Sequence, residues 1–176
     1  AFGGSCLPKD LKAITHEART LEVDVPVLDA ILESNQRQIA RVVSKLLPYK
    51  GRSLGFLGLS FKGGTDDLRC SPIVEVIETM LGKGFEIRIH DRHVALARLM
   101  GANREYIERE IPHISKLLCE SAEELVDRSE VLIINHRDEA FRPALKRLKA
   151  GQVVVDLVRM VDRSEVNGAE YYGLCW

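Results

Sequence analysis

A short segment at residues 3–10 contains the side chains that a nucleophilic site needs. It reads GGSCLPKD and joins a flexible turn, the thiol of Cys6, the cation of Lys9 and the carboxylate of Asp10. A thiol attacks as its thiolate, which nearby positive charge or a helix N-terminus favours, and Pro8 indicates a helix start just after Cys6. Asp10, about one helical turn further on, can accept a proton from an attacking water. The alternative is a free, half-buried cysteine before a helix.

A second polar cluster, GLSFKGGTDDLRCSP at residues 58–72, follows an apolar run and precedes a helix start. Its glycines let the backbone approach an anion, and Lys62 and Arg69 can pair with phosphates. In open α/β sheets, ligands bind at such strand ends. The cluster therefore predicts a nucleotide-type phosphate ligand, with a polar connecting loop as the alternative. Arg159 follows another predicted strand, but a solvated surface arginine explains its position equally well.

The first 50 residues read as helical and must position the first segment. Apolar spacing predicts helices over 9–22 and 27–47, separated by Asp24-Val25-Pro26. The second helix is about 30 Å long at 1.5 Å per residue and carries a broad apolar stripe. The stripe packs either on its own domain or against a partner, as a dimer or interdomain spine, and the pattern favours neither.

After residues 48–51 (PYKG) the pattern changes to short apolar strands that alternate with helices. The strands are expected at 53–59, 85–90, 131–135, 152–156 and, as an edge strand, 170–175. The helices are expected at 71–81, 94–100, 121–128, 139–148 and in part of 106–118. Continuous apolar strands joined by helices predict an α/β fold with a parallel sheet covered on both faces.

Composition and charge exclude several classes of protein. The chain has 176 residues and a net charge of -1 with no basic block, which argues against a nucleic-acid surface. No apolar run approaches the roughly 20 residues that span a bilayer. The cysteines are widely spaced, which favours reduced thiols in a cytoplasmic protein over disulfides or zinc, and no metal site is expected. They are Cys6, Cys70, Cys119 and Cys175.

Taken together, these segments resemble the UDP-glucose/GDP-mannose dehydrogenase family. GGSCLPKD resembles the catalytic cysteine segment of that family, and LGLSFKGGTDDLRCSP resembles its nucleotide-sugar-binding signature. Other segments resemble the GDP-mannose branch of the family: GANREYIEREIPH, INHRDEAF, VVDLV and the terminal GLCW. The resemblance covers essentially the whole chain, and the first two motifs are specific in combination.

The resemblance implies an N-terminal NAD-binding Rossmann domain, a helical middle that dimerises and a C-terminal α/β domain that holds the nucleotide. This chain resembles the end of the middle at 1–50 and the Rossmann-like C-terminal domain at 51–176. We therefore expect a part of a larger enzyme, without its Rossmann domain and inactive alone. The long helix at 27–47 is the expected core of a homodimer.

The implied reaction is a two-step, four-electron oxidation of the sugar C6 alcohol to a carboxylate with two NAD, GDP-mannose giving GDP-mannuronate. Cys6 attacks the intermediate aldehyde and later carries a thioester, and Asp10 assists the water that hydrolyses it. The resemblance assigns four further contacts: Lys9 and Arg69 to NAD, and Gly3 and Lys62 to the nucleotide sugar.

The chain departs from the family pattern at one motif position. Cys70 stands where the family often has an acidic residue, which adds a second thiol near the site. Arg159 matches a less uniform position and receives no role. Two alternatives stay open: a UDP-sugar dehydrogenase of the same family, and a nucleotide-sugar-binding module without catalysis.

Overall fold

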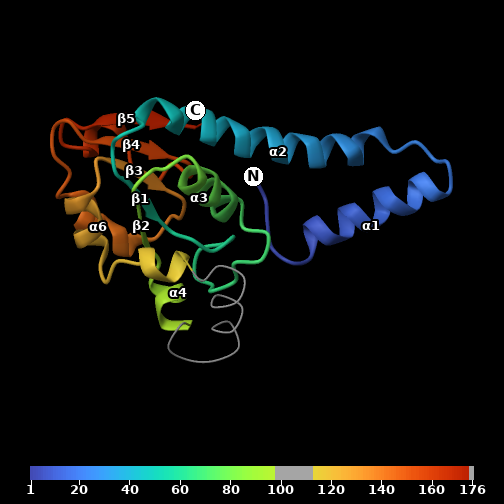
Figure 1. Ribbon diagram of the computed structural model, residues 1–176, viewed down its shortest axis with the longest axis horizontal. Helices are drawn as coiled ribbons and strands as arrows, with labels where there is room; N and C mark the ends of the chain where they lie inside the picture. Colours follow the sequence, from blue (N-terminus) through green and yellow to red (C-terminus); the bar gives the residue numbers. More distant parts are fainter. Residues whose placement is uncertain (98–112, 175–176) are drawn as a thin grey trace.

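A computed structural model describes residues 1–97 and 113–174 of the chain. A parallel sheet lies at one end of the molecule and forms the centre of its α/β domain (Figure 1). Within these residues the sheet has five strands in the order β2-β1-β3-β4-β5, and every neighbouring pair is parallel. The strands are β1 Leu54–Leu57, β2 Ile87–His90, β3 Val131–Ile134, β4 Val153–Asp156 and β5 Glu170–Gly173. The predicted parallel sheet and its last edge strand are confirmed.

Helices connect the strands and precede them. They are α1 Leu7–Thr20, α2 Pro26–Leu46, α3 Pro72–Gly82, α4 Arg92–Ala97, α6 Ala122–Arg128 and α7 Arg142–Leu145. Single 3-10 turns lie at Leu47–Tyr49, Ile114–Leu117, Glu139–Phe141 and Arg163–Glu165. In the described part of the chain, no helix is long and apolar enough to cross a membrane.

Several boundaries differ from the predicted ones. The helix expected at 139–148 is shorter, because a 3-10 turn leads into α7 and Pro143, which has no N–H, stands in its first turn. Ser71 precedes α3 as predicted, but its hydroxyl donates to the carbonyl of Leu59 instead of capping the helix. The predictions that fall within 98–112 and 175–176 lie outside the described residues.

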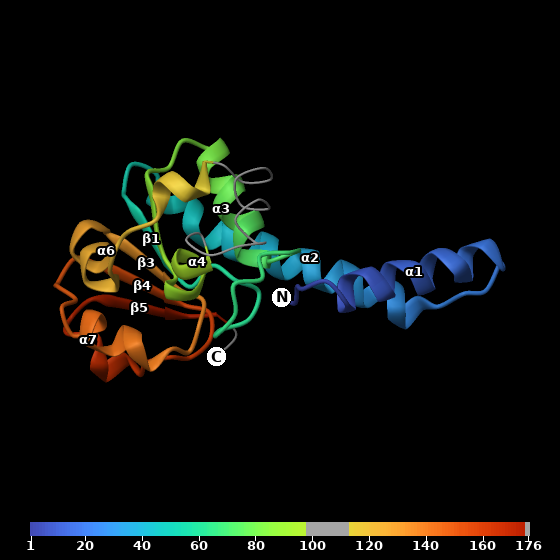
Figure 2. The same ribbon diagram turned by 90° about the horizontal axis from the view of Figure 1, so that it is seen from below.

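Two helical layers cover the two faces of the sheet (Figure 2). Alternate strand residues point to opposite faces, so Leu54 and Phe56 of β1 pack with α2 and α3 in one core cluster, whereas Leu57 packs with α6 and α7 in another. The sheet is therefore buried on both sides, as its continuous apolar strands predict.

The helix pair α1–α2 extends beyond the sheet domain (Figure 1). The C-terminal half of α2 is anchored: Val42 and Leu46 lie in the core, and the Lys45 ammonium stands 3.3 Å from the ring centre of Tyr172 on β5. The N-terminal half leaves Val27 72% and Ile31 37% exposed. The predicted stripe thus divides into one half that packs on its own domain and one half that the described residues leave open.

Candidate active site

Cys6 occupies the N-terminal end of α1. It is the N-cap residue, and its carbonyl accepts the first helical hydrogen bond from the Asp10 N–H at 2.8 Å. The thiol is exposed and lies 3.8 Å from the hydroxyl of Ser5. The helix start that Pro8 predicts is therefore present, with the exposed Cys6 thiol at its N-terminal end.

Lys9 and Asp10 lie in the first turns of the same helix. The Lys9 ammonium is 3.5 Å from the Asp10 carboxylate, and the two side chains are 74% and 60% exposed. Such an exposed ion pair contributes little to stability. Both groups are therefore free to turn toward a bound ligand or a water.

The loop after β1 packs directly on the segment that carries Cys6. The N–H of Gly4 donates to the carbonyl of Arg69 at 3.0 Å. A Cβ on Gly3 would lie 2.2 Å from the carbonyl oxygen of Cys70, and one on Gly4, where φ is +88°, would lie 2.9 Å from the ring of Phe61. Only glycine fits this approach without a shift. The two sequence motifs therefore form one structural unit.

Within this loop Arg69 is held by a neighbouring carboxylate. Its Nε and Nη2 donate to the two carboxylate oxygens of Asp67 at 2.8 and 2.7 Å. These bonds lower the pKa of the Asp67 carboxyl from its ordinary value, since they favour the charged form. Because the Arg69 side chain remains 57% exposed, the fork is oriented yet accessible to an anion.

Lys62 lies at the tip of the same loop. Its carbonyl accepts hydrogen bonds from the hydroxyls of Ser60 at 2.7 Å and Thr65 at 2.8 Å, which fix the backbone. The residue itself is exposed. The structure thus places Lys62 and Arg69 on one loop, beside the segment that carries Gly3, Cys6, Lys9 and Asp10.

The strand order creates a crevice at the carboxyl end of the sheet. The connections after β1 and β3 lead to helices on opposite faces, and ligands bind at such switch points. A cavity of about 190 Å³ opens there, lined by Ser60 and Phe61 after β1, Asn135 after β3 and Val158 after β4. We call it the sheet-edge cavity. Phe61 also packs on Gly4, so the cavity and the Cys6 segment share a wall.

A buried carboxylate that the sequence reasoning missed supports this edge. Asp91 follows β2 and is 2% exposed. One of its oxygens accepts from the N–H groups of Leu59 and Ser60 at 2.8 and 3.3 Å, and the other from those of His93 and Val94 at 3.0 and 3.2 Å. Asp91 therefore ties the start of the β1 loop to the first turn of α4. The signal in the sequence is an aspartate between a strand and a helix start.

His136, after β3, completes this support from the other side of β1. Its Nε2 donates to the carbonyl of Ser60 at 2.9 Å, and its Nδ1 lies 3.7 Å from the Asp91 carboxylate. Gly58, with φ +95°, passes so close that a Cβ would lie 2.5 Å from the imidazole ring. Histidine and aspartate here hold the loop in place, and the described residues contain no group of three His, Cys, Asp or Glu side chains that could bind a metal.

Arg159 lies at the same edge, on the turn after β4. The buried carboxylate of Asp156 accepts from the N–H groups of Val158 at 3.0 Å and Met160 at 2.7 Å, which closes the turn. Arg159 is exposed between them with φ +55°, a strained conformation for a residue with a side chain. The structure therefore places Arg159 at the sheet edge and gives it no contact that identifies a ligand.

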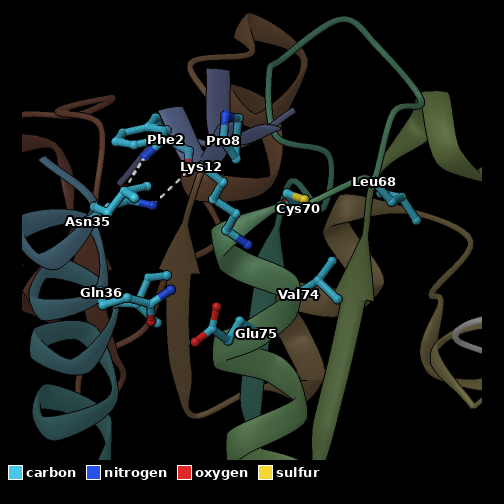
Figure 3. A pocket seen from close by; sticks show the side chains of 12 residues that line it. Phe2, Pro8, Lys12, Asn35, Gln36, Leu68, Cys70, Val74 and Glu75 are labelled. Atoms are coloured by element: carbon cyan, nitrogen blue, oxygen red, sulfur yellow. Dashed lines mark hydrogen bonds between the residues drawn. The ribbon is translucent and has the colours of Figure 1, made fainter. Parts of the chain in front are cut away.

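A second cavity of about 380 Å³ lies among α1, α2 and α3 (Figure 3). Lys12 of α1 and Glu75 of α3 point into it, and Cys70 lies at its wall. Asn35 of α2 contacts Phe2 there through two hydrogen bonds. We call it the inter-helix cavity; Phe2, in the segment that leads to Cys6, is one of its lining residues.

Comparison with known proteins decides the family of the chain. Residues 55–163 match the model for the UDP-binding domain of the UDP-glucose/GDP-mannose dehydrogenase family, and residues 1–37 match the model for its central domain. The chain belongs to this family. The resemblance noted in the two motifs is thus confirmed, and residues 55–163 correspond to the UDP-binding domain of the family.

Curated relatives of this family match all or nearly all of the chain. GDP-mannose 6-dehydrogenases of Pseudomonas aeruginosa and Pseudomonas putida are 46% and 43% identical to it over 176 residues. A UDP-glucose 6-dehydrogenase of Rickettsia bellii is 30% identical over 97% of the chain. The chain spans 40% of the length of each of these relatives.

Solved structures give the same result for the fold. A ternary complex of GDP-mannose dehydrogenase from Pseudomonas aeruginosa superposes with a TM-score of 0.92 at 45% identity, and the match covers all of this chain and 40% of that one. A UDP-glucose dehydrogenase from Pyrobaculum islandicum superposes with a TM-score of 0.78 at 29% identity over all of this chain and 38% of that one. The Rossmann-like α/β fold is therefore confirmed.

The Asp67–Arg69 pair predicts a pH-dependent stability. The pair stabilises the fold above the ordinary pKa of Asp67, 3.8, and loses this effect as the pH falls through the lowered folded-state pKa. We expect Asp67→Asn to reduce the free energy of unfolding by at most about 1 kcal/mol at neutral pH, because the pair is partly exposed. The difference should shrink toward zero in acid, measured by urea denaturation at several pH values. Arg69→Gln should remove the same pH dependence. If Asp67→Asn lowers the free energy of unfolding by the same amount at acid and neutral pH, the Asp67–Arg69 pair is not the source of the pH dependence.

Proposed function

We propose that this chain supplies the catalytic thiol and the nucleotide-sugar site of an NAD-dependent GDP-mannose 6-dehydrogenase. The observation that carries the proposal is the contact between the Cys6 segment and the loop after β1, through the Gly4–Arg69 hydrogen bond of 3.0 Å. A thiol at a helix N-terminus and two exposed cations on the adjoining loop suit a site that brings a reactive carbon together with two diphosphates, one of the nucleotide sugar near Lys62 and one of NAD near Arg69.

Cys6 acts in the second half of the reaction. The C6 alcohol first loses two electrons and two protons and becomes an aldehyde. The Cys6 thiolate adds to the aldehyde carbon, and the alkoxide that forms takes up a proton to give a thiohemiacetal. The thiohemiacetal loses two further electrons and two protons to give a thioester. Water then attacks the thioester carbon, breaks the C–S bond and releases the carboxylate and the free thiol. The sum is a four-electron oxidation.

Asp10 and Lys9 assist from the first turns of α1. The Asp10 carboxylate is exposed and one helical turn from Cys6, where it can take the proton of the attacking water. The Lys9 ammonium lies in the helical turn that follows Cys6 and adds positive charge there. Because their mutual ion pair is weak, either group can leave it for a ligand.

Lys9 and Arg69 fit the anionic diphosphate of NAD. Both are cations with more than half of the side chain exposed; Lys9 lies on the Cys6 segment, and Arg69 lies on the loop that packs against it. Bound NAD would supply the oxidant, one equivalent in each of the two oxidations. The chain contributes charge and orientation: Asp67 holds the Arg69 fork in one direction, so less side-chain freedom is lost when an anion binds.

The nucleotide sugar is proposed to lie along the same loop, with its diphosphate near Lys62 and its nucleoside in the sheet-edge cavity. Gly3 lets the Cys6 turn pack against the Cys70 carbonyl, 2.2 Å from where a Cβ would lie, and its backbone is the proposed contact with the sugar. GDP-mannose is preferred over a UDP-sugar because the GDP-mannose 6-dehydrogenases are 43% to 46% identical to the chain, whereas the UDP-glucose 6-dehydrogenase is 30% identical.

The open half of α2 is proposed to be the core of a homodimer. Val27 and Ile31 are exposed on α2, and Ile14 and Leu21 are exposed on α1, so an apolar surface remains uncovered on the helix pair. A second copy of the chain offers the matching surface. We also propose the division at residue 50, with the helical segment at 1–50 and the nucleotide-sugar domain at 51–176.

The role of Cys6 is tested by replacement with serine in the enzyme that contains this chain. Cys6→Ser should abolish formation of the uronate product, measured by mass spectrometry, because an alkoxide of serine is not available at neutral pH. Cys70→Ser is the matched control on the adjoining loop and should keep the rate within about twofold. Uronate formed by Cys6→Ser at the wild-type rate would eliminate the thioester step.

The ligand is tested by calorimetric titration with GDP-mannose and UDP-glucose, followed by competition between them. We expect GDP-mannose to bind and UDP-glucose to compete weakly. Lys62→Ala should raise the Kd by about 10- to 100-fold through loss of a diphosphate contact. Lys83→Ala is the control and should leave the Kd unchanged. Lys83 follows the C-terminal end of α3, whereas the loop after β1 leads into the N-terminal end of that helix. Tighter binding of UDP-glucose would favour the UDP-sugar alternative.

The dimer is tested by sedimentation equilibrium. A charge placed at Val27 must be buried if α2 pairs with a second copy, so Val27→Asp should raise the dimer dissociation constant at least about tenfold. Lys83→Asp, an exposed change on the sheet domain, should leave it unchanged. A wild-type chain that stays monomeric at high concentration, or a Val27→Asp dimer as stable as the wild type, would refute this interface.

A further inference from the structure

Asn35 of α2 holds the backbone of Phe2 by two hydrogen bonds (Figure 3). The Phe2 N–H donates to Asn35 Oδ1 at 2.7 Å, and Asn35 Nδ2 donates to the Phe2 carbonyl at 3.1 Å. A carboxamide offers one acceptor and two donors side by side, so it satisfies both backbone groups of one residue. Both bonds are partly buried at the inter-helix cavity, where water competes less with them.

We call the two hydrogen bonds between Asn35 and Phe2 the clamp. The clamp fixes the start of the segment that ends at the Cys6 thiol. Phe2 is followed by Gly3 and Gly4, and the Gly4 N–H is bonded in turn to the Arg69 carbonyl at 3.0 Å. The segment is therefore attached to α2 on one side and to the loop after β1 on the other. Two glycines in a row have wide conformational freedom, so without such attachments the position of Cys6 would vary.

The helix that carries the clamp is itself rigidly placed. Ile39, one turn after Asn35, lies in the core, as do Val42 and Leu46 further along α2. Lys45 of the same helix stands over the ring of Tyr172 on β5. Because α2 is packed on the sheet domain, the bonds from Asn35 to Phe2 hold the start of the Cys6 segment in a fixed position relative to that domain.

We propose that Asn35 is a positioning residue for the thiol of Cys6, an inference that rests on the proposed function of that thiol. It acts through the backbone of Phe2 and sets where the N-terminal end of α1 begins. A misplacement of about 1 Å at a reacting group can reduce the rate by about 10²-fold. Loss of the clamp therefore affects the rate of the chemical step more than the binding of the nucleotide sugar.

The kinetic test compares variants of the enzyme that contains this chain. Asn35→Ala should lower kcat by about 10- to 100-fold and leave KM for the nucleotide sugar within about threefold. Gln36→Ala, a neighbouring amide that lines the same cavity, is the matched control and should change neither constant. An Asn35→Ala enzyme with wild-type kcat would overturn the proposal.

The variant Asn35→Asp separates positioning from mere loss of stability. Its ionised carboxylate can accept from the Phe2 N–H but places a second acceptor against the Phe2 carbonyl, whereas the protonated carboxyl again offers a donor. Lys12 and Glu75 are the charged residues that line this cavity from α1 and α3. We expect the ratio of its kcat to that of the wild type to rise as the pH falls, while the ratio for Asn35→Ala stays low. Equal pH profiles for the two variants would contradict the clamp.

Amide hydrogen exchange tests the clamp without reference to any reaction. In Asn35→Ala the Gly4 N–H should exchange at least about tenfold faster, while the Val42 N–H in the anchored half of α2 keeps its rate. Faster exchange with lowered kcat supports the proposal, and unchanged Gly4 exchange overturns it. A wild-type enzyme that oxidises no nucleotide sugar would refute the proposed function, and the exchange rate of Gly4 would then decide the clamp by itself.

Discussion

The backbone contact between the Cys6 segment and the loop after β1 is the constraint on which the site depends. The Gly4 N–H meets the Arg69 carbonyl at 3.0 Å, and the approach is so close that neither Gly3 nor Gly4 has room for a side chain. This contact joins a thiol at a helix N-terminus to a loop with two exposed cations. Without it, the nucleophile and the anion-binding groups would belong to separate parts of the molecule.

Buried carboxylates keep the other side of that contact in place. Asp91 accepts four backbone hydrogen bonds and joins the β1 loop to α4, while Asp156 closes the turn that carries Arg159. A buried charge is costly unless it is well paired, and here backbone N–H groups supply the pairing. These buried polar interactions therefore lie where strands end and where loops must keep one conformation. The proposed ligand lies at the same edge of the sheet.

The helix α2 connects the sheet domain, the proposed dimer surface and the Cys6 segment. Its anchored half packs on the sheet, its open half is the proposed dimer surface, and Asn35 lies between them beside the Cys6 segment. The apolar stripe predicted the helix but not this division, because periodicity shows which face is apolar and not what covers it. For the same reason, periodicity gives no sign that the side chain of Asn35 bonds to Phe2.

The sequence by itself determined the kinds of element, the parallel sheet and the two chemical motifs, since these follow from local spacing and from residue type. It also determined the family, because GGSCLPKD and the 58–72 cluster occur together. Tertiary structure decided which contacts join and support these motifs. Gly4 packs against Phe61, Asn35 bonds to Phe2, and His136 packs against Gly58 and bonds to Ser60. Those contacts join residues far apart in the chain, and no local pattern records which distant backbone group a side chain will meet once the sheet and helices have packed.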